Sequence, residues 1–360
     1  MPILPLHGHA ALRRRLAERA LSGALPASLL LHGQAGVGKQ RLALWLGQLL
    51  LCEAPSVDGP CSRCRPCSYA AECAHPDLHW YFPRPRLKDS DASAADVKDD
   101  FREGRQERVD AGGLYAAPSG LEGLFVATVR AIVQQAAVSP ALGRRKVFVI
   151  GDAERMAVTE EKAEAANAFL KLLEEPPADT LIILTSSEPG ALLPTIRSRV
   201  VSVRVPPLGE EDMRAFLADP VVVARLGEST GAALDKRLRE AGGAPGALVG
   251  GDDRQAAERG ARALLEAASG DRANRYKAAM SMGASKARGA FSDTLDALTV
   301  TLHGSARDAV RRNRPAAALA AARGMDAVDR ARELAGGNIN PQLLTARLLR
   351  ELAPPAEGGR

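Results

Sequence analysis

A glycine-rich loop between an apolar run and an amphipathic segment most constrains the fold of this 360-residue chain. Leu29–Leu31 predict a buried strand, and the apolar spacing i, i+3, i+4, i+7 over residues 42–49 predicts a helix. The spacing Gly33-x4-Gly38-Lys39 between them is that of a P-loop, in which backbone N–H groups and the lysine hold phosphates. The motif therefore predicts an α/β domain with a nucleotide fold. Its candidate cofactor-binding residues are Gly33, Gly36, Gly38 and Lys39.

Two positions around this loop depart from a working nucleotide site. The residue after the lysine should be Ser or Thr, whose hydroxyl binds Mg²⁺, but it is Gln40. A second predicted strand, Val147–Ile150, should end in an acidic residue that helps to hold the metal, but Gly151 follows it and Asp152 comes one position later. Losing metal ligands removes hydrolysis sooner than it removes the backbone cradle. Residual ATP binding at Lys39 therefore stays an open alternative.

The second strong pattern is the cysteine series Cys52-x8-Cys61-x2-Cys64-x2-Cys67. Four thiolates with two tight x2 steps predict one tetrahedral Zn²⁺ site, and an Fe–S cluster is the alternative for the same ligands. Four protein ligands leave no open position, which favours a structural role. The fifth cysteine, Cys73, lies outside the spacing and is interpreted as a structural thiol.

Composition excludes little and permits a nucleic-acid partner. The formal net charge is +5 and hydrophobic residues make up 46% of the chain, which is ordinary for a globular protein. We expect no membrane span, because no stretch approaches about 18 uninterrupted apolar residues. The first residues lack the layout of a signal peptide, so we expect a reducing cytoplasm, where clustered cysteines indicate metal.

The pattern of elements predicts three domains. Residues 1–206 form the α/β domain, with a zinc module at about 52–67 and an exposed polar insertion at about 83–120, partly helical or disordered. The pair Pro206-Pro207 marks a linker. Residues 207–251 predict a small helical domain, and residues 252–360 predict a helical bundle.

Several of these pieces occur together in one known family. Besides the P-loop and the cysteine series, the chain carries His75-Pro76-Asp77, the string Asn167–Pro177 and the pair Ser198-Arg199. In this order they resemble the clamp-loader branch of the AAA+ family. The resemblance implies a RecA-like AAA+ P-loop domain with a zinc insertion, a small helical lid and an all-α collar domain that mediates oligomerisation.

Bacterial members of this branch include the ATP-hydrolysing gamma/tau subunits and the delta-prime family. Gln40, Gly151 and Pro245, the last standing where gamma/tau-like chains carry a phosphate-sensing arginine, make the chain resemble the delta-prime family. This implies no ATPase activity of its own and a place in the DNA polymerase III holoenzyme, a DNA-directed DNA polymerase. The implied partners are gamma/tau and delta subunits in a hetero-pentamer, which loads the sliding clamp onto primed DNA in the bacterial cytoplasm, at the replisome.

The resemblance also assigns a role to Arg199, with Ser198 before it. In the family this pair lies at the subunit boundary, and the arginine reaches in trans into a neighbouring ATP site. Such an arginine finger stabilises charge on the transferring phosphoryl group and is worth about 10³–10⁵ in rate. For Arg197 the interpretation is a solvated arginine.

Two other functions remain as alternatives. The first is an active gamma/tau-like clamp-loader ATPase with unusual metal ligands. The second is a zinc-containing DNA-binding protein that uses the cysteine module and the basic charge. Against the second, the module lacks the interleaved aromatic residues and the basic recognition helix that such a protein needs.

Overall fold

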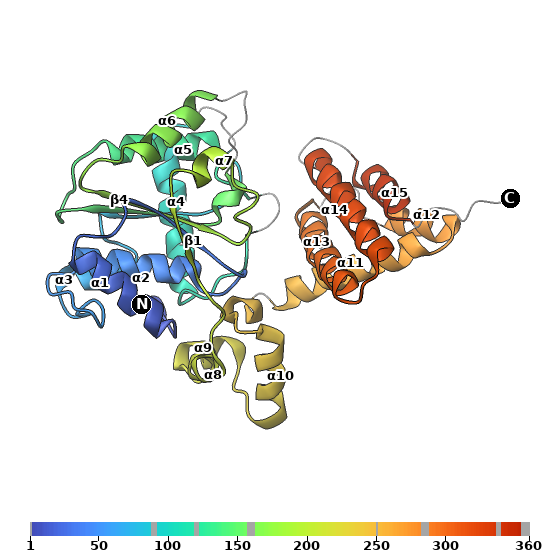
Figure 1. The fold of residues 1–360 in the computed structure, drawn as a ribbon, viewed down its shortest axis with the longest axis horizontal. Helices are drawn as coiled ribbons and strands as arrows, with labels where there is room; N and C mark the ends of the chain where they lie inside the picture. The colour runs from blue at the N-terminus through green and yellow to red at the C-terminus, as the bar shows by residue number, and fades with distance from the viewer. Residues whose placement is uncertain are drawn as a thin grey trace. The chain divides into compact units, whose positions relative to one another are not determined.

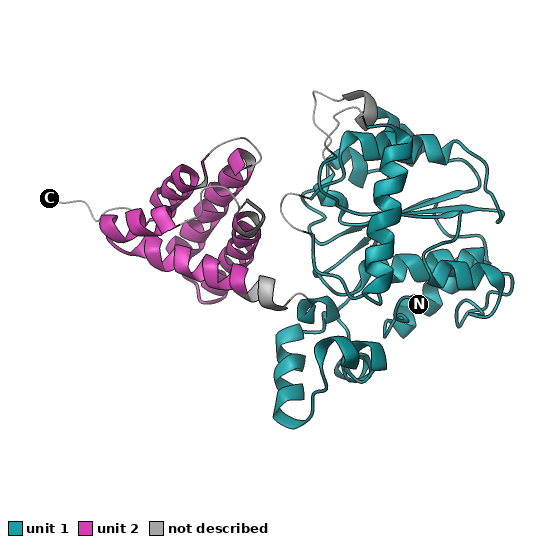
Figure 2. Cartoon of the chain, turned by 180° about the vertical axis from the view of Figure 1, so that it is seen from behind, with its two compact units in different colours: residues 1–118, 122–249 teal, residues 119–121, 250–360 magenta. Residues whose placement is uncertain are grey.

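The computed structural model describes residues 2–87, 92–118, 122–156, 163–249, 251–281, 288–335 and 340–353. The chain divides into two compact units, one within residues 1–249 and the other from residue 250 onward (Figure 2). The three-domain division expected from the sequence stays a prediction.

A parallel sheet forms the centre of unit 1. Among the described residues it has five strands in the order β2-β3-β4-β1-β5. Leu30 of β1 pairs with Leu184 of β4 on one side and Ser202 of β5 on the other. The inner strands are continuous apolar runs because both faces of the sheet are covered. The strands are β1 (Ser28–His32), β2 (Leu78–Tyr81), β3 (Lys146–Ile150), β4 (Thr180–Ser186) and β5 (Val201–Arg204).

Helices cover the two faces of this sheet, which confirms the predicted α/β class. Helices α1 and α2 lie along one face, and α5 and α6 lie along the other (Figure 1). Leu42, Leu46 and Leu49 of α2 are fully buried in the main core, at the predicted helical spacing. The helices up to residue 200 are α1 (Ala10–Leu21), α2 (Lys39–Leu51), α3 (Arg65–Ala71), α4 (Ala94–Asp110), α5 (Val126–Ala136), the 3₁₀ turn η1 (Ala153–Arg155), α6 (Ala163–Glu174) and α7 (Pro194–Arg197).

Helix α4 belongs to the segment that we expected to be an exposed polar insertion. The structure shows a helix there, and its Val97 and Phe101 are 1% exposed and pack in the main core. The helix carries its apolar residues on one face only, so composition alone suggested a solvated segment. Residues 88–91 and 119–121 of the expected insertion lie outside the described residues.

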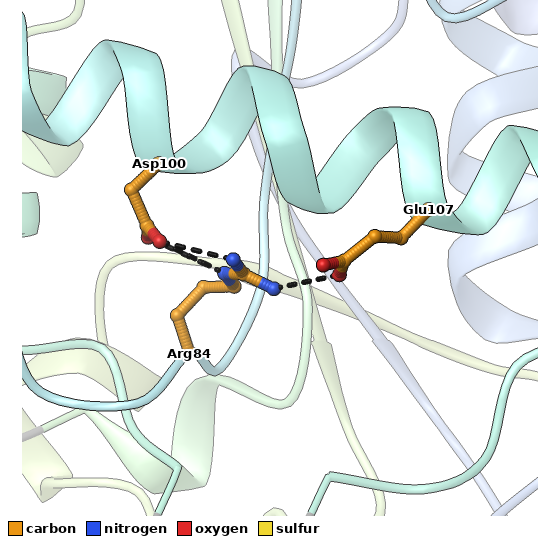
Figure 3. Close-up of polar contacts among 3 residues, drawn as sticks. All are labelled: Arg84, Asp100 and Glu107. Carbon is orange, nitrogen blue, oxygen red and sulfur yellow. Dashed lines mark hydrogen bonds and ion pairs between the residues drawn. The ribbon is translucent and has the colours of Figure 1, made fainter.

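An ion-pair bridge fastens α4 to the chain that leaves β2. The Arg84 guanidinium donates to Asp100 Oδ1 at 3.0 Å and to Glu107 Oε2 at 2.9 Å (Figure 3). Gly104 lies between the two acids, and a Cβ there would come within 2.8 Å of the guanidinium. The glycine thus makes room for Arg84 to reach both carboxylates.

The His75-Pro76-Asp77 motif fixes the loop that leads into β3. Asp77 accepts hydrogen bonds from the backbone N–H groups of Ala141, Leu142 and Gly143 at 2.5–2.8 Å. Burial by itself raises the pKa of Asp77, but the three N–H donors outweigh it, so the pKa lies below the usual range. The motif is structural in this part of the chain.

The remaining helices of unit 1 follow the sheet. They are α8 (Glu210–Leu217), α9 (Pro220–Leu226), α10 (Gly231–Ala241) and the 3₁₀ turn η3 (Pro245–Leu248). The N-terminal segment packs against them: Leu4 shares a small core with Phe216 and Leu217, and His7 Nε2 lies 3.2 Å from Asp219 Oδ2.

All regular secondary structure among the described residues of unit 2 is α-helical. Its core is built from Ala and Leu side chains that face inward, among them Leu295, Leu298 and Leu349, which are fully buried. No described helix of the chain has the length and apolar character needed to cross a membrane. The helices are α11 (Gly251–Ser269), α12 (Arg272–Ser281), α13 (Arg288–Arg311), α14 (Pro315–Ala335) and α15 (Pro341–Leu352).

Candidate nucleotide and metal sites

The P-loop connects β1 to α2, and its lysine is bound by its own chain. Lys39 Nζ donates to Gly33 O at 3.0 Å, to Gln34 O at 2.9 Å and to Ser187 Oγ at 2.9 Å. All three ammonium protons therefore have protein acceptors. Burial lowers the pKa of Lys39, an effect that Asp152 and Glu154 partly oppose.

Gln40 is buried at the point where the P-loop hydroxyl would stand. Its amide oxygen accepts hydrogen bonds from Trp80 Nε1 at 2.9 Å and Arg108 Nη1 at 3.2 Å. Its amide nitrogen donates to Asp152 Oδ2 at 3.0 Å. The amide oxygen that would ligate a cation thus accepts two N–H donors instead, and the Asp152 carboxylate accepts the N–H group of the same amide.

Arg108 of α4 contacts Gln40 and stacks on three aromatic rings. Its guanidinium carbon lies 3.3 Å from the ring centre of Phe82, 3.8 Å from that of Tyr115 and 4.7 Å from that of Trp80. The side chain is buried, and burial lowers its pKa. Stacking of a desolvated guanidinium on aromatic faces contributes about 2 kcal/mol or more per favourable contact. A fixed cation therefore lies beside Gln40.

The acidic side of the site lies just after β3. A Cβ built on Gly151 would lie 2.5 Å from Gln40 Cδ, so no larger residue fits there while Gln40 keeps its position. Asp152 follows in a left-handed backbone conformation with φ 47°. Burial first, and then the neighbouring Glu154, raise the pKa of Asp152.

Two other segments of the chain also contact the P-loop. His9 Nε2 lies 3.0 Å from Val37 O, which ties the start of α1 to the P-loop. From the other direction, Gly246 N of η3 donates to Gly36 O at 2.9 Å. A Cβ on Gly246 would lie 2.7 Å from Gly36 Cα. The His9 side chain and the backbone of η3 thus pack directly on Val37 and Gly36 of the P-loop.

The four predicted metal ligands come together. The Sγ atoms of Cys52, Cys61, Cys64 and Cys67 all lie within 4.8 Å of one another, and Cys52 Sγ is 4.0 Å from Cys64 Sγ. A tetrahedral Zn–S₄ centre with bonds of about 2.3 Å separates its sulfurs by about 3.8 Å, so the cluster fits a metal ion.

Backbone N–H groups favour the thiolate form of Cys61, whereas burial raises the pKa of Cys52 and of Cys67. Cys52 Sγ accepts hydrogen bonds from Cys61 N at 3.2 Å and Ala54 N at 3.4 Å. Hydrogen bonds from the N–H groups of Arg63 and Cys64 lower the pKa of Cys61 to about 6. The four sulfurs thus form a donor set that could bind one metal ion.

Arg199 lies elsewhere in unit 1, just after α7. Its guanidinium pairs with Glu174 at the end of α6, with Nε 2.6 Å from Oε1, and Nη1 donates to Thr195 O at 2.8 Å. Ser198 Oγ is 3.3 Å from Arg199 Nη1. The Arg199 side chain is 28% exposed. The two family motifs, the string that ends at Pro177 and the Ser-Arg pair, are thus joined by an ion pair.

The role of Arg108 was missed by sequence reasoning, although a signal was present. Val97, Phe101, Gly104 and Arg108 follow one another at i, i+4, i+7 and i+11, and all four are buried in α4. An arginine on the apolar stripe of a helix has to be buried, and a buried guanidinium needs acceptors or aromatic faces.

A protein-family model described as "DNA polymerase III, delta subunit" matches residues 8–209 of the chain. The DNA polymerase III subunit delta' of Pseudomonas aeruginosa is 33% identical over 216 residues, which cover 60% of this chain and 52% of that protein. The corresponding subunit of Escherichia coli is 30% identical over 240 residues, covering 66% of this chain and 58% of that protein. The matched stretch therefore spans about half the length of these relatives.

A gamma/tau subunit is also similar, but less so. That of Mycobacterium tuberculosis is 27% identical over 229 residues, covering 62% of this chain and 32% of that protein. The family model covers more than half of the chain, and the parallel sheet, the P-loop and the cysteine cluster lie in the matched region. The chain belongs to the DNA polymerase III delta-prime family.

Proposed function

We propose that this chain is a delta-prime subunit that helps to load the sliding clamp onto primed DNA without hydrolysing ATP itself. Its partners are gamma/tau and delta subunits in a hetero-pentamer of the bacterial cytoplasm. The proposal rests on the family and on the state of the P-loop, in which Lys39 and Gln40 bind the chain's own groups.

The contacts around Gln40 are the main support for the proposal that this chain does not hydrolyse ATP. Hydrolysis needs a metal ion between protein oxygens and the phosphates. Here the oxygen of Gln40 accepts protons from Trp80 and Arg108, and its nitrogen occupies Asp152. Bringing Mg²⁺ to this point would break those hydrogen bonds and place it beside a buried guanidinium.

The catalytic contribution that we propose is made by Arg199 in the ATP site of a neighbouring gamma/tau subunit. The side chain is partly exposed and always charged, and its ion pair with Glu174 is itself partly exposed to solvent. A partly exposed pair is worth about 1 kcal/mol or less, so a phosphate can replace the carboxylate.

Zinc is the metal that we propose for the four cysteines. A closed set of four thiolates suits structural Zn²⁺, which would hold the segment between α2 and α3 together.

The first test measures nucleotide binding and turnover by the isolated chain. We expect no ATP turnover above background, and calorimetry with ATP in Mg²⁺ and in EDTA should give the same weak or absent binding. Turnover that Lys39→Ala abolishes would instead establish the gamma/tau-like ATPase.

The second test uses the complex reconstituted with gamma/tau and delta. We expect Arg199→Ala to lower ATP hydrolysis by about 10³-fold or more at the affected site and to impair clamp loading. Arg197→Ala, an exposed arginine two residues away, is the matched control and should keep the wild-type rate. An Arg199→Ala complex with wild-type hydrolysis would overturn the role in trans.

A further inference from the structure

A cluster of arginines surrounds the turn between α13 and α14 in unit 2. We call residues 303–323 the arginine turn. The segment contains five arginines and one aspartate, a net charge of +4, whereas the whole chain carries +5. The arginines, all exposed, are Arg307, Arg311, Arg312, Arg314 and Arg323.

The turn places three of these arginines, Arg311, Arg312 and Arg314, within four consecutive residues. Helix α13 ends at Arg311, and Asn313 takes a left-handed conformation with φ 53° that reverses the chain. Arg314 N donates to Ala309 O at 2.8 Å, and Pro315 begins α14 at once. Arg312 and Arg314 thus flank the reversal on an ordered backbone.

Structural roles do not account for this cluster. Elsewhere in unit 2, Arg330, Arg332 and Arg347 each pair with a carboxylate at 2.6–2.8 Å. Among the described residues, the arginine turn shows one ion pair, between Arg311 and Asp308 at 3.9 Å. The four other guanidinium groups of the turn have no carboxylate partner in the described part of the chain and can take an external anion.

Helix electrostatics explain only part of the pattern. A cation in the last turn of α13 is favourable, which suits Arg311. Arg314 stands immediately before the N-terminus of α14, where a positive charge is unfavourable. Mutual repulsion among exposed like charges adds to this cost, which an external anion would relieve.

We propose that the arginine turn binds the phosphate backbone of nucleic acid. Guanidinium groups match phosphate oxygens in bidentate geometry and are weakly hydrated. The segment contains no Phe, Tyr or Trp, so it has no stacking platform for bases. Contacts to phosphate carry no sequence information, and the binding is therefore independent of sequence. This surface does not depend on any role of the P-loop or of Arg199.

The test measures binding of fluorescein-labelled DNA to the full-length chain by anisotropy at several salt concentrations. A four-fold variant, Arg307→Gln, Arg311→Gln, Arg312→Gln and Arg314→Gln, is compared with a control that removes the same charge from exposed arginines of unit 1. That control is Arg15→Gln, Arg19→Gln, Arg144→Gln and Arg145→Gln. Circular dichroism melting confirms that both variants are folded.

We expect the turn variant to weaken DNA binding about tenfold or more at low salt. It should also reduce the slope of log K against log salt by about 0.7–0.9 for each phosphate that the variant no longer neutralises. The control variant should retain most of the affinity, and two DNA sequences of equal length should bind alike. Equal reductions in affinity in both variants, or unchanged affinity in the turn variant, would overturn the proposal.

A competition experiment separates nucleic acid from an acidic protein partner. Poly-glutamate at the same charge concentration should displace the DNA poorly, because carboxylates spaced along a peptide lack the charge density of phosphodiesters. Displacement as effective as that by unlabelled DNA would assign the turn to acidic polypeptides and overturn the proposal.

Discussion

Gln40 occupies the space that a side chain at position 151 would need. A Cβ on Gly151 would lie 2.5 Å from Gln40 Cδ and 2.6 Å from both terminal atoms of its amide. The two departures from a working P-loop site, Gln40 and Gly151, are therefore sterically linked. While Gln40 keeps its contacts with Asp152, Trp80 and Arg108, position 151 has room only for glycine.

This steric link predicts that substitutions at positions 40 and 151 have non-additive effects on the free energy of unfolding. Gly151→Asp alone should destabilise the chain by about 1–3 kcal/mol, because the new side chain overpacks a closed site. In the Gln40→Thr background the same change should cost less, with a coupling free energy of about 1 kcal/mol or more. Urea unfolding of the two single variants and the double variant measures this cycle.

The control for this cycle is Gly190→Asp. A Cβ at exposed Gly190 meets no atom within 4 Å, so its effect should add to that of Gln40→Thr. Additive effects at Gly151 as well would show that Gln40 leaves that space when required.

The strands and the P-loop helix were predictable because their periodicity is local. Leu29–Leu31 and Val147–Ile150 are short, uninterrupted apolar runs, and each lies in a buried strand. The four cysteines were predictable for the same reason, since their spacing alone brings the sulfurs together.

The hydrogen bonds that Gln40 forms in the P-loop site could not be predicted, because they join segments that are distant in the sequence. Gln40 meets Arg108, which is 68 residues away, and Asp152, which is 112 residues away. The polar composition around α4 hid the apolar stripe that delivers Arg108. Likewise, Glu174 and Arg199 each stood in a recognised motif, but only the fold shows that they pair.

Metal binding makes a prediction with a matched control. We expect about one zinc per purified chain, and Cys64→Ser should reduce that content and lower the melting temperature by several degrees. Cys73→Ser changes a buried cysteine outside the cluster and should leave the metal content unchanged. Zinc content and thermal unfolding measured on the same preparations check this. Equal metal content in Cys64→Ser and the wild type would contradict the assignment of ligands.

Acidification should destabilise the chain through His79. Burial first, and then nearby Arg105, lower its pKa to about 4, and among the described residues its Nε2 has no hydrogen-bond partner. The unfolded chain therefore binds this proton below about pH 6.5, whereas the folded chain resists it until about pH 4. Above about pH 6.5 the imidazole is mainly neutral in both states, so its titration does not lower stability. Between pH 7.5 and pH 5 the titration of His79 lowers the free energy of unfolding by about 2 kcal/mol.

His79→Leu isolates this contribution. The unfolding free energies of the variant and the wild type should run parallel above about pH 7, and the wild type should lose about 2 kcal/mol relative to the variant as the pH falls to 5. The difference between the two curves removes effects that both proteins share, including protonation of the cysteine cluster. Parallel curves over the whole range would show that His79 is accommodated when charged.

The ion pair between Glu174 and Arg199 predicts that removing the charge of Glu174 raises the rate of ATP hydrolysis by the complex. For Arg199 to reach a phosphate on a neighbouring subunit, its guanidinium has to leave the carboxylate of Glu174. Glu174→Gln weakens that pair while keeping a hydrogen-bond acceptor. A partly exposed pair is worth about 1 kcal/mol or less, so ATP hydrolysis by the reconstituted complex should rise by up to about fivefold. Glu175→Gln removes the same charge one residue further along and should leave the rate unchanged. A lower rate in Glu174→Gln alone would mean that the carboxylate positions Arg199 for the reaction instead of competing for it.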